Sequence, residues 1–197
     1  GTSARSSLAG DSIYFVMFDR YKNGDSTNDK GGLVGAVNVT GYLPTDIAYS
    51  HGGDLKGLAD GCSKTDGSGD GIPRIKRMGF GAVWISPPFV QNFVQSGSSA
   101  YHGYFATDFT KVDPRWGTMA DFKVVSDCAH RLGMKVILDI IVNHTGDVIT
   151  YANSRPFNGQ VNESAYIPAG MENIKAPAFL NNINNYHNMG AINSWSN

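Results

Sequence analysis

Three apolar runs of strand-forming residues punctuate this chain, at residues 12–18, 82–86 and 135–145. They are rich in Val, Ile and aromatic residues, which favour strands because their side chains pack well on a pleated surface. The runs hardly alternate between apolar and polar residues, as is typical of strands in a covered parallel sheet. We expect the run at 135–145 to be a central strand that is buried on both faces.

Helical periodicity appears between these runs. An interrupted pattern covers residues 54–78, and a continuous one covers residues 118–132. Thr118 is a suitable N-cap for the second helix, and Gly79 and Gly133 are suited to end the two patterns. The order strand, helix, strand, helix, strand predicts a parallel sheet with right-handed crossovers.

Long segments without helical periodicity follow the first two strands, at residues 22–53 and 89–113. The first is rich in Asn, Asp, Gly and Pro and the second in Gly, Ser and aromatic residues, and we expect both to be loops. The turns after the helices are short. Long loops at the carboxyl ends of the strands are typical of a (β/α) barrel, which carries its functional site at that end. Residues 146–197 are polar, Asn-rich and irregular.

The third apolar run contains one acid, Asp139, and ends in Asn143 and His144. A carboxylate inside a buried strand is costly unless it is paired or hydrogen-bonded. Polar groups at the carboxyl end of a parallel strand lie where α/β folds build their sites. This strand end is therefore the first place to look for a function.

Composition narrows the class of protein. The chain has 197 residues, of which 41% are hydrophobic and 17% charged, and its formal net charge is -1. This charge gives no support for binding nucleic acid or an anionic membrane, and no apolar run reaches transmembrane length. We expect Cys62 and Cys128 to be two free thiols, although a bond between them is possible. Residues 1–7 fit a secreted protein whose signal peptide has been removed, and they would also fit a cytosolic one.

The combination of motifs resembles the amino-terminal part of the α-amylase family of glycoside hydrolases, on the side of the cyclodextrin glucanotransferases, maltogenic amylases and cyclomaltodextrinases. The segments that carry the resemblance appear in the family's order, namely Asp19–Tyr21, Asn23–Asp25, Asn28–Asp29, Gly52–Leu55, Gly79–Pro87, Tyr101–Tyr104, Asp113–Pro114, Asp139–His144 and Asn185–Asn188. Each segment is weak alone. Their order along nearly the whole chain makes the resemblance specific.

The resemblance implies the first three βα units of a (β/α)8 TIM barrel at residues 1–143. Residues 144–197 would begin the irregular domain that the family inserts after the third strand. The implied function is that of a retaining hydrolase or transglycosylase that cleaves α-1,4-glucosidic bonds in starch, maltodextrin or cyclodextrin. The alternative is a non-catalytic relative of the same fold that binds a sugar or a protein partner.

The resemblance also implies roles for individual residues. His102, Tyr104 and His144 would contact the sugar at the cleavage subsite, where an aromatic face stacks on a pyranose and imidazole donates to a hydroxyl. Asn143 would hold a calcium ion between the barrel and the inserted domain. Phe105 stands where the family usually has Trp, which is a departure from the family pattern at this subsite.

A second calcium site is implied in the loop after the first strand. Calcium prefers several oxygen ligands, and this loop is dense in them. The ligands would be Asn23, Asp25, Asn28, Asp29, Gly52 and Asp54. The segment with Asp66, Ser68 and Asp70 is a weaker metal candidate, because Arg77 stands where an EF-hand loop has its Glu. A surface insertion is the preferred interpretation of that segment.

Retaining glycosidases need two carboxylates about 5 Å apart. In the family these come from later strands, and the Gly-x-Arg-x-Asp motif that marks one of them is absent from this sequence. We therefore expect no catalytic residue in this chain and expect the chain alone to be inactive. The expected partners are an α-glucan and the remainder of the same polypeptide, which would supply the missing strands.

Overall fold

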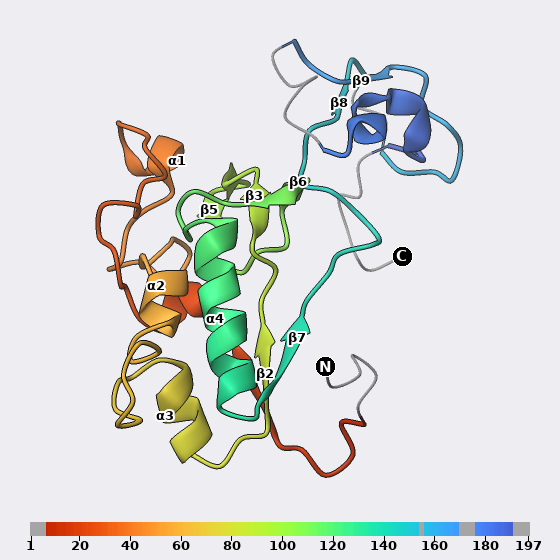
Figure 1. Ribbon diagram of the computed structural model, residues 1–197. Coiled ribbons are helices and arrows are strands. Elements are labelled where there is room, and N and C mark those ends of the chain that lie inside the picture. The colour runs from red at the N-terminus through yellow and green to blue at the C-terminus, as the bar shows by residue number, and fades with distance from the viewer. Residues whose placement is uncertain (1–6, 154–155, 170–175, 191–197) are drawn as a thin grey trace.

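A three-stranded parallel sheet forms the centre of the molecule (Figure 1). The computed structural model describes residues 7–153, 156–169 and 176–190. Strand β2 (Ala82–Ile85) lies between β1 (Ile13–Val16) and β7 (Lys135–Leu138). Tyr14 pairs with Val83, which in turn pairs with Val136, so the three strands are in register. The predicted strand order along the chain and its parallel pairing are confirmed.

Three helices lie against one face of this sheet, α2 (Leu55–Leu58), α3 (Ile72–Arg77) and α4 (Met119–Arg131). The core between them is fully apolar and includes Val83, Ile85, Leu55, Ile75 and Val125. The predicted cap of α4 is confirmed. Thr118 accepts a hydrogen bond from the Asp121 backbone N–H, and the Asp121 carboxylate accepts one from Thr118 in return.

The prediction of a central strand at 135–145 was wrong in two respects. The strand ends at Leu138, and β7 is an edge strand with β2 as its neighbour. Beyond it the apolar side chains point into solvent, since Ile140 is 62% and Val142 is 89% exposed. The second face of the sheet is not covered by any helix within the described ranges, and Phe15 and Trp84 remain partly exposed there.

The segment 89–113 is not a simple loop, contrary to expectation. β3 (Phe89–Gln91) pairs with β6 (Ala106–Val112) in antiparallel fashion, and β4 (Val94–Gln95) forms a hairpin with β5 (Ser98–Ser99). Two register shifts interrupt the β3–β6 pairing. Such bulges break the alternation of apolar and polar residues by which a strand is recognised in a sequence.

Cys62 and Cys128 form a disulfide, so the expectation of two free thiols was wrong. Cys62 follows α2 in a Gly-rich loop, and Cys128 lies on the face of α4 that turns toward this loop. Arg131 also donates a hydrogen bond to the carbonyl of Cys62. The disulfide and this hydrogen bond tie the loop to α4.

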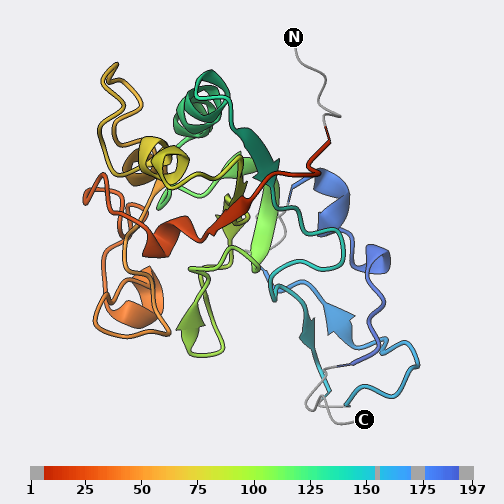
Figure 2. The ribbon, with the colours of Figure 1, turned by 90° about the horizontal axis from the view of Figure 1, so that it is seen from below.

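The remaining elements are short. They comprise η1 (Phe18–Arg20), α1 (Val37–Thr40), the hairpin of β8 (Thr150–Tyr151) and β9 (Ala165–Tyr166), η2 (Ala178–Asn181) and η3 (Ile183–Asn185). The described residues from β8 onward lie beyond the carboxyl ends of the central strands and away from α2 and α3 (Figure 1 and Figure 2). Within the described ranges, no helix has both the length and the apolar character that a bilayer crossing requires.

Candidate functional site

The polar end of the sheet brings together residues from three segments. Tyr104 lies on the loop before β6, Asp139 directly follows β7, and Trp84 lies on β2. Oδ2 of Asp139 accepts a hydrogen bond of 2.8 Å from the hydroxyl of Tyr104 and one of 3.0 Å from Nε1 of Trp84. The single acid of the third apolar run is therefore hydrogen-bonded, but it follows the strand and is only half-buried, whereas we expected it inside a buried strand.

These contacts determine the protonation state of Tyr104. Burial, together with the hydrogen bond to the negative Asp139, raises the pKa of Tyr104 to about 12. The phenol is therefore protonated at neutral pH and acts as the donor to Asp139. Its ring lies nearly parallel to the imidazole of His102, with centroids 5.6 Å apart.

His102 is held as a neutral donor. Its Nδ1 accepts a hydrogen bond of 3.0 Å from the backbone N–H of Tyr104, so the proton of the neutral ring resides on Nε2. Burial, and then the charge of Arg20, lowers the pKa of His102. The arrangement leaves an Nε2–H group that can donate to a ligand hydroxyl.

His144 has the opposite polarity. Its Nε2 lies 3.0 Å from the backbone carbonyl of Tyr104, which can only accept, so Nε2 carries the proton. In the neutral ring the remaining nitrogen, Nδ1, is then an acceptor. The imidazole is exposed to solvent. We expected His144 to donate to a sugar, whereas here its donor is used on Tyr104 and Nδ1 is the group available to a ligand.

Arg20 holds the loop that carries His102. Its guanidinium lies 4.0 Å from the ring centroid of Tyr101 and donates hydrogen bonds to the carbonyls of Ile47 and Tyr49 at 2.8 and 2.9 Å. It also pairs with Asp19 at 3.3 Å. Arg20 is a functional candidate that the sequence patterns alone did not single out, because a lone Arg after a strand carries no distinctive spacing.

Asn143, the first expected calcium ligand, is an exposed residue beside His144. Across the described ranges, no three His, Cys, Asp or Glu side chains converge as a metal site would require. The structure therefore places Asn143 at the rim without gathering acidic side chains around it.

The loop after β1 does bring its oxygen-bearing residues together. Nδ2 of Asn23 donates to Oδ1 of Asp29 at 2.7 Å, and Nδ2 of Asn28 donates to Oδ2 of Asp54 at 3.1 Å. Gly52 lies against this pair, since a Cβ atom on it would be 2.5 Å from Oδ1 of Asp29. The six residues that the resemblance implies here thus come together from two segments, and their binding of calcium stays a prediction.

The Asp54 carboxylate, however, is already saturated. Oδ1 accepts from the backbone N–H groups of Gly57 at 2.6 Å and Gly24 at 3.1 Å, and Oδ2 accepts from Asp25 at 2.9 Å besides Asn28. Asp54 is also the N-cap of α2. Its main role here is to join the loop to the helix, because a carboxylate offers about four acceptor positions.

Three features of the loop fit a hard cation. Oδ1 of Asn28 is buried without a hydrogen-bond partner. Burial raises the pKa of Asp29, and the neighbouring charges of Asp54 and Asp25 act in the same direction. Gly52 presents its backbone where a side chain would not fit. A cation with oxygen ligands would satisfy Asn28 and offset the crowded negative charge.

Asp25 is engaged differently. Its carboxylate lies 2.5 Å from Nζ of Lys56 and accepts a hydrogen bond from the Thr27 backbone N–H at 3.0 Å. Lys56 and Thr27 lower the pKa of Asp25 to about 2. It could reach a cation only by leaving Lys56, so it is a less available ligand than Asp29.

The loop with Asp66, Ser68 and Asp70 is filled by a side chain of the protein. The guanidinium of Arg77 donates to the carbonyls of Gly67 and Gly69, the latter at 2.8 Å. Asp66 accepts from the Ser68 backbone N–H at 2.9 Å. An arginine in this position takes the place that a metal would need, which favours the interpretation as a surface insertion.

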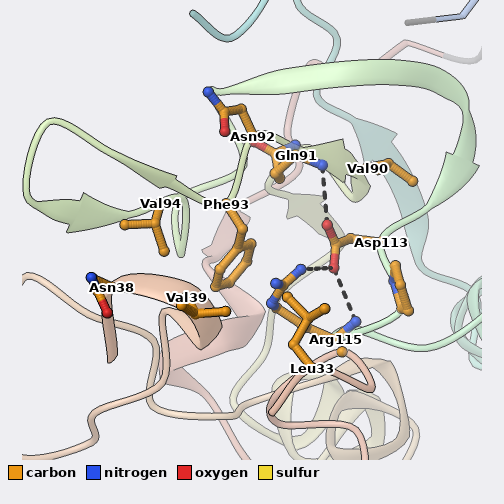
Figure 3. A pocket seen from close by; sticks show the side chains of 12 residues that line it. Leu33, Asn38, Val39, Val90, Gln91, Asn92, Phe93, Val94, Asp113 and Arg115 are labelled. Carbon is orange, nitrogen blue, oxygen red and sulfur yellow. Dashed lines mark hydrogen bonds and ion pairs between the residues drawn. The ribbon is translucent and has the colours of Figure 1, made fainter. Parts of the chain in front are cut away.

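An open pocket of about 450 Å³ lies between residues 31–39, residues 90–94 and residues 113–115 (Figure 3). At its base Asp113 accepts hydrogen bonds from the backbone N–H groups of Gln91 and Arg115, both at 3.0 Å. Its carboxylate also lies 3.2 Å from Nη1 of Arg115, whose guanidinium stacks on Phe93 at 3.7 Å. Burial raises the pKa of Asp113, and the charge of Arg115 opposes this shift. These contacts tie β3 to the segment that follows β6.

Comparison with known proteins is consistent with this geometry. A family model described as the catalytic domain of alpha amylase matches residues 15–190. The α-amylase of Streptomyces lividans is 33% identical over 226 positions, covering 96% of this chain and 23% of that protein. The periplasmic α-amylase of Escherichia coli K12 is 35% identical, covering 68% of this chain and 19% of that protein.

Among solved structures, a cyclomaltodextrin glucanotransferase with a three-domain ABC distribution superposes with a TM-score of 0.56 and 36% identity. The superposition covers 79% of this chain and 28% of that one. The chain thus spans about a quarter of the length of such relatives.

Proposed function

The chain belongs to the alpha-amylase family, and from this premise we propose that it is part of an enzyme that hydrolyses or transfers α-1,4-linked glucans. The family's catalytic domain is a (β/α)8 barrel, of which this chain contains a fragment. The proposed substrates are starch, maltodextrin or cyclodextrin. Hydrolysis and transfer remain two versions of one retaining mechanism.

Within that domain, residues 1–143 would be the first three βα units and residues 144–197 the beginning of the inserted domain. The parallel order of β1, β2 and β7 and their connecting helices support the first assignment. The β8–β9 hairpin and the short helical turns beyond the carboxyl ends of the central strands support the second. Residues 154–155, 170–175 and 191–197 of the second unit, and residues 1–6 of the first, lie outside the described residues.

The observation that carries the proposal is the arrangement around Tyr104. One ring, one neutral donor on His102 and one acceptor on His144 all meet at the carboxyl end of the sheet. A glucose unit presents apolar C–H faces and hydroxyls that donate as well as accept. Paired groups of opposite polarity beside an aromatic ring suit such a ligand, and they would orient the sugar for cleavage.

The reaction itself would need two carboxylates about 5 Å apart. We assign neither to this chain, because Asp139 is engaged with Tyr104 and Trp84 through Oδ2 and serves to hold the ring. The nucleophile and the acid/base would come from the rest of the polypeptide. In this proposal the chain supplies binding and orientation only.

We further propose that the loop of Asn23, Asn28, Asp29 and the Gly52 backbone holds calcium, with Asp25 as a ligand that must exchange its lysine. The bound ion would neutralise the acidic side chains and tie the two segments together. Asn143 would contribute to a separate ion at the start of the inserted domain. The support is the unpartnered oxygen of Asn28 and the oxygen-rich chemistry of the set.

A location outside the cytosol is part of the proposal. The Cys62–Cys128 disulfide suits an oxidising compartment, and one of the relatives is named a periplasmic enzyme. Such a location would also suit an enzyme acting on large glucans.

The test uses the complete polypeptide that contains this chain. Its activity on soluble starch, maltodextrin and cyclodextrin is measured, with chromatography of the products. Turnover of any of these glucans supports the proposal. Glucan binding without turnover would instead support the non-catalytic relative, and neither binding nor turnover would refute both.

A further inference from the structure

The segment that carries His144 has little structure of its own. Residues 139–149 contain no helix or strand, and Asn143 and His144 are exposed. The side chain of His144 makes a hydrogen bond to the Tyr104 carbonyl. A single exposed hydrogen bond contributes little net free energy, so the position of His144 must be set by what holds its backbone.

That backbone is held three residues further on. The N–H group of Asp147 donates to Oε1 of Gln95 at 2.8 Å, and the carbonyl of Asp147 accepts from Nδ2 of Asn92 at 2.8 Å. Asn92 Nδ2 also lies 3.3 Å from Gln95 Oε1, which closes the ring of contacts. The half-buried side chains of Gln95 and Asn92 therefore hydrogen-bond the two peptide groups that flank the Asp147 Cα.

The two gripping residues are themselves fixed. Gln95 is in β4, whose hairpin with β5 turns through Ser96 and Gly97 at φ values of 52° and 80°. The backbone N–H of Asn92 donates to the carbonyl of Phe105 at 2.8 Å. The grip thus connects the segment of His144 to the loop that leads from Tyr104 into β6.

Gly146 completes the contact. Its N–H donates to the carbonyl of Ala106 at 2.8 Å. A Cβ atom on Gly146 would lie 2.5 Å from the Phe105 carbonyl oxygen and 3.1 Å from Cβ of Asn92. The chain can approach the Phe105 loop this closely only because residue 146 has no side chain.

We propose that Asn92 and Gln95 are positioning residues for sugar binding, which fix His144 against Tyr104 by clamping the peptide groups of Asp147. The proposal rests on the function proposed above, and it adds two residues that do not touch the sugar. The two amides act in opposite senses, since Asn92 must donate and Gln95 must accept. Their backbone partners dictate these orientations, because an N–H cannot accept and a carbonyl cannot donate.

This polarity gives a matched pair of variants, Asn92→Asp and Gln95→Glu. Each replaces an amide by an isosteric carboxylate, and each adds one negative charge beside the Asp147 backbone. Gln95→Glu keeps the acceptor for Asp147 N–H, whereas Asn92→Asp removes the donor and sets a negative oxygen against the Asp147 carbonyl. A purely electrostatic or destabilising effect would be similar in the two variants.

The kinetic experiment measures kcat and KM on maltodextrin with the complete polypeptide. We expect Asn92→Asp to lower kcat/KM roughly five- to tenfold, as loss of one hydrogen bond implies, and Gln95→Glu to stay within about twofold. Asn92→Asp is also measured in the His144→Ala variant, which distinguishes loss of the position of His144 from a general loss of stability. Asn92→Asp should cost little more in that background, because the residue it positions is gone. The proposal would be overturned if Asn92→Asp and Gln95→Glu lowered kcat/KM equally. It would also be overturned if Asn92→Asp lowered kcat/KM as much in the His144→Ala variant as in the wild type.

A second measurement does not depend on activity. Amide hydrogen exchange of Asp147 should be slow in the wild type and in Gln95→Glu, and fast in Gln95→Ala, because only the last removes its acceptor. Equal exchange in all three would refute the clamp even if the enzyme is active. A correct exchange pattern in a polypeptide that neither binds nor cleaves glucans would leave the clamp in place and refute the function assigned to it.

Discussion

The hydroxyl of Tyr104 donates a hydrogen bond of 2.8 Å to the carboxylate of Asp139, across 35 positions of sequence. Trp84 donates to the same oxygen, so one carboxylate atom holds an aromatic ring from the rim loop and another from the central strand. The carboxyl end of the sheet is therefore cross-linked around Asp139. This relationship gives the Tyr104 ring, for which we propose sugar binding, a fixed place beside His102 and His144.

Replacing either donor should weaken this cross-link. Tyr104→Phe and Trp84→Phe each remove one hydrogen bond to Asp139 and keep an aromatic ring. We expect each to lower the free energy of unfolding by about 1 kcal/mol, since hydrogen bonds to charged groups contribute modestly where solvent is close. Denaturant titration measures this. A double variant that loses much more or less than the sum would reveal coupling through the shared oxygen, whereas no loss in either variant would contradict the cross-link.

The disulfide should contribute strongly to stability. Cys62 and Cys128 are 66 positions apart. Closing a loop of that size in the unfolded chain contributes roughly 4 kcal/mol in the chain-entropy treatment. The paired variant Cys62→Ser with Cys128→Ser should lose most of this free energy in denaturant titration. Adding a reductant should destabilise the wild type and leave the paired variant unchanged, and the opposite pattern would contradict the bond.

Asp54 should contribute more to the free energy of unfolding than an ordinary helix N-cap does. Its carboxylate is fully buried and accepts four hydrogen bonds, so Asp54→Ala leaves buried N–H groups without partners. We expect a loss of about 3 kcal/mol or more in the free energy of unfolding. Thr118→Ala is the control, because it removes the exposed cap of α4 and should cost about 1 kcal/mol. Similar losses in both variants would count against the bridging role of Asp54.

Asp29 links pH, charge and the proposed calcium. Its pKa in the folded chain is raised by burial, so without a cation stability falls as pH rises from the ordinary value of 3.8 through the raised pKa. With a chelator present, Asp29→Asn should therefore be more stable than the wild type above this window. Calcium should raise the melting temperature of the wild type and have little effect on the variant. The measurement is thermal unfolding at several pH values, and an equal calcium response in both proteins would contradict the site.

Some elements were predictable because their signals are local. The spacing of apolar residues and the Thr118 cap define α4, and Pro73 suits the first turn of α3. The meeting of Asn28 with Asp54 was reachable only through family resemblance, because 26 positions separate them. Sequence patterns describe one segment at a time and carry little information on such distant contacts.

Other features could not be predicted for physical reasons. The strand after Gly133 is equally apolar whether it is central or at an edge, so its composition could not show that β7 has one neighbour. Bulges hid the pairing of β3 with β6. Asn92 and Gln95 are common polar residues, and nothing near them in the sequence indicates that they hydrogen-bond the backbone of Asp147, 52 or more positions away.

The most direct test of the central claim is the effect of His144→Ala on kcat/KM for maltodextrin, measured in the complete polypeptide. The account predicts a loss of about tenfold or more, because the imidazole contacts the sugar as the bond is cleaved, with little change in unfolding because the ring is exposed. An unchanged kcat/KM would contradict the assignment of His102, Tyr104 and His144 as the sugar-binding site.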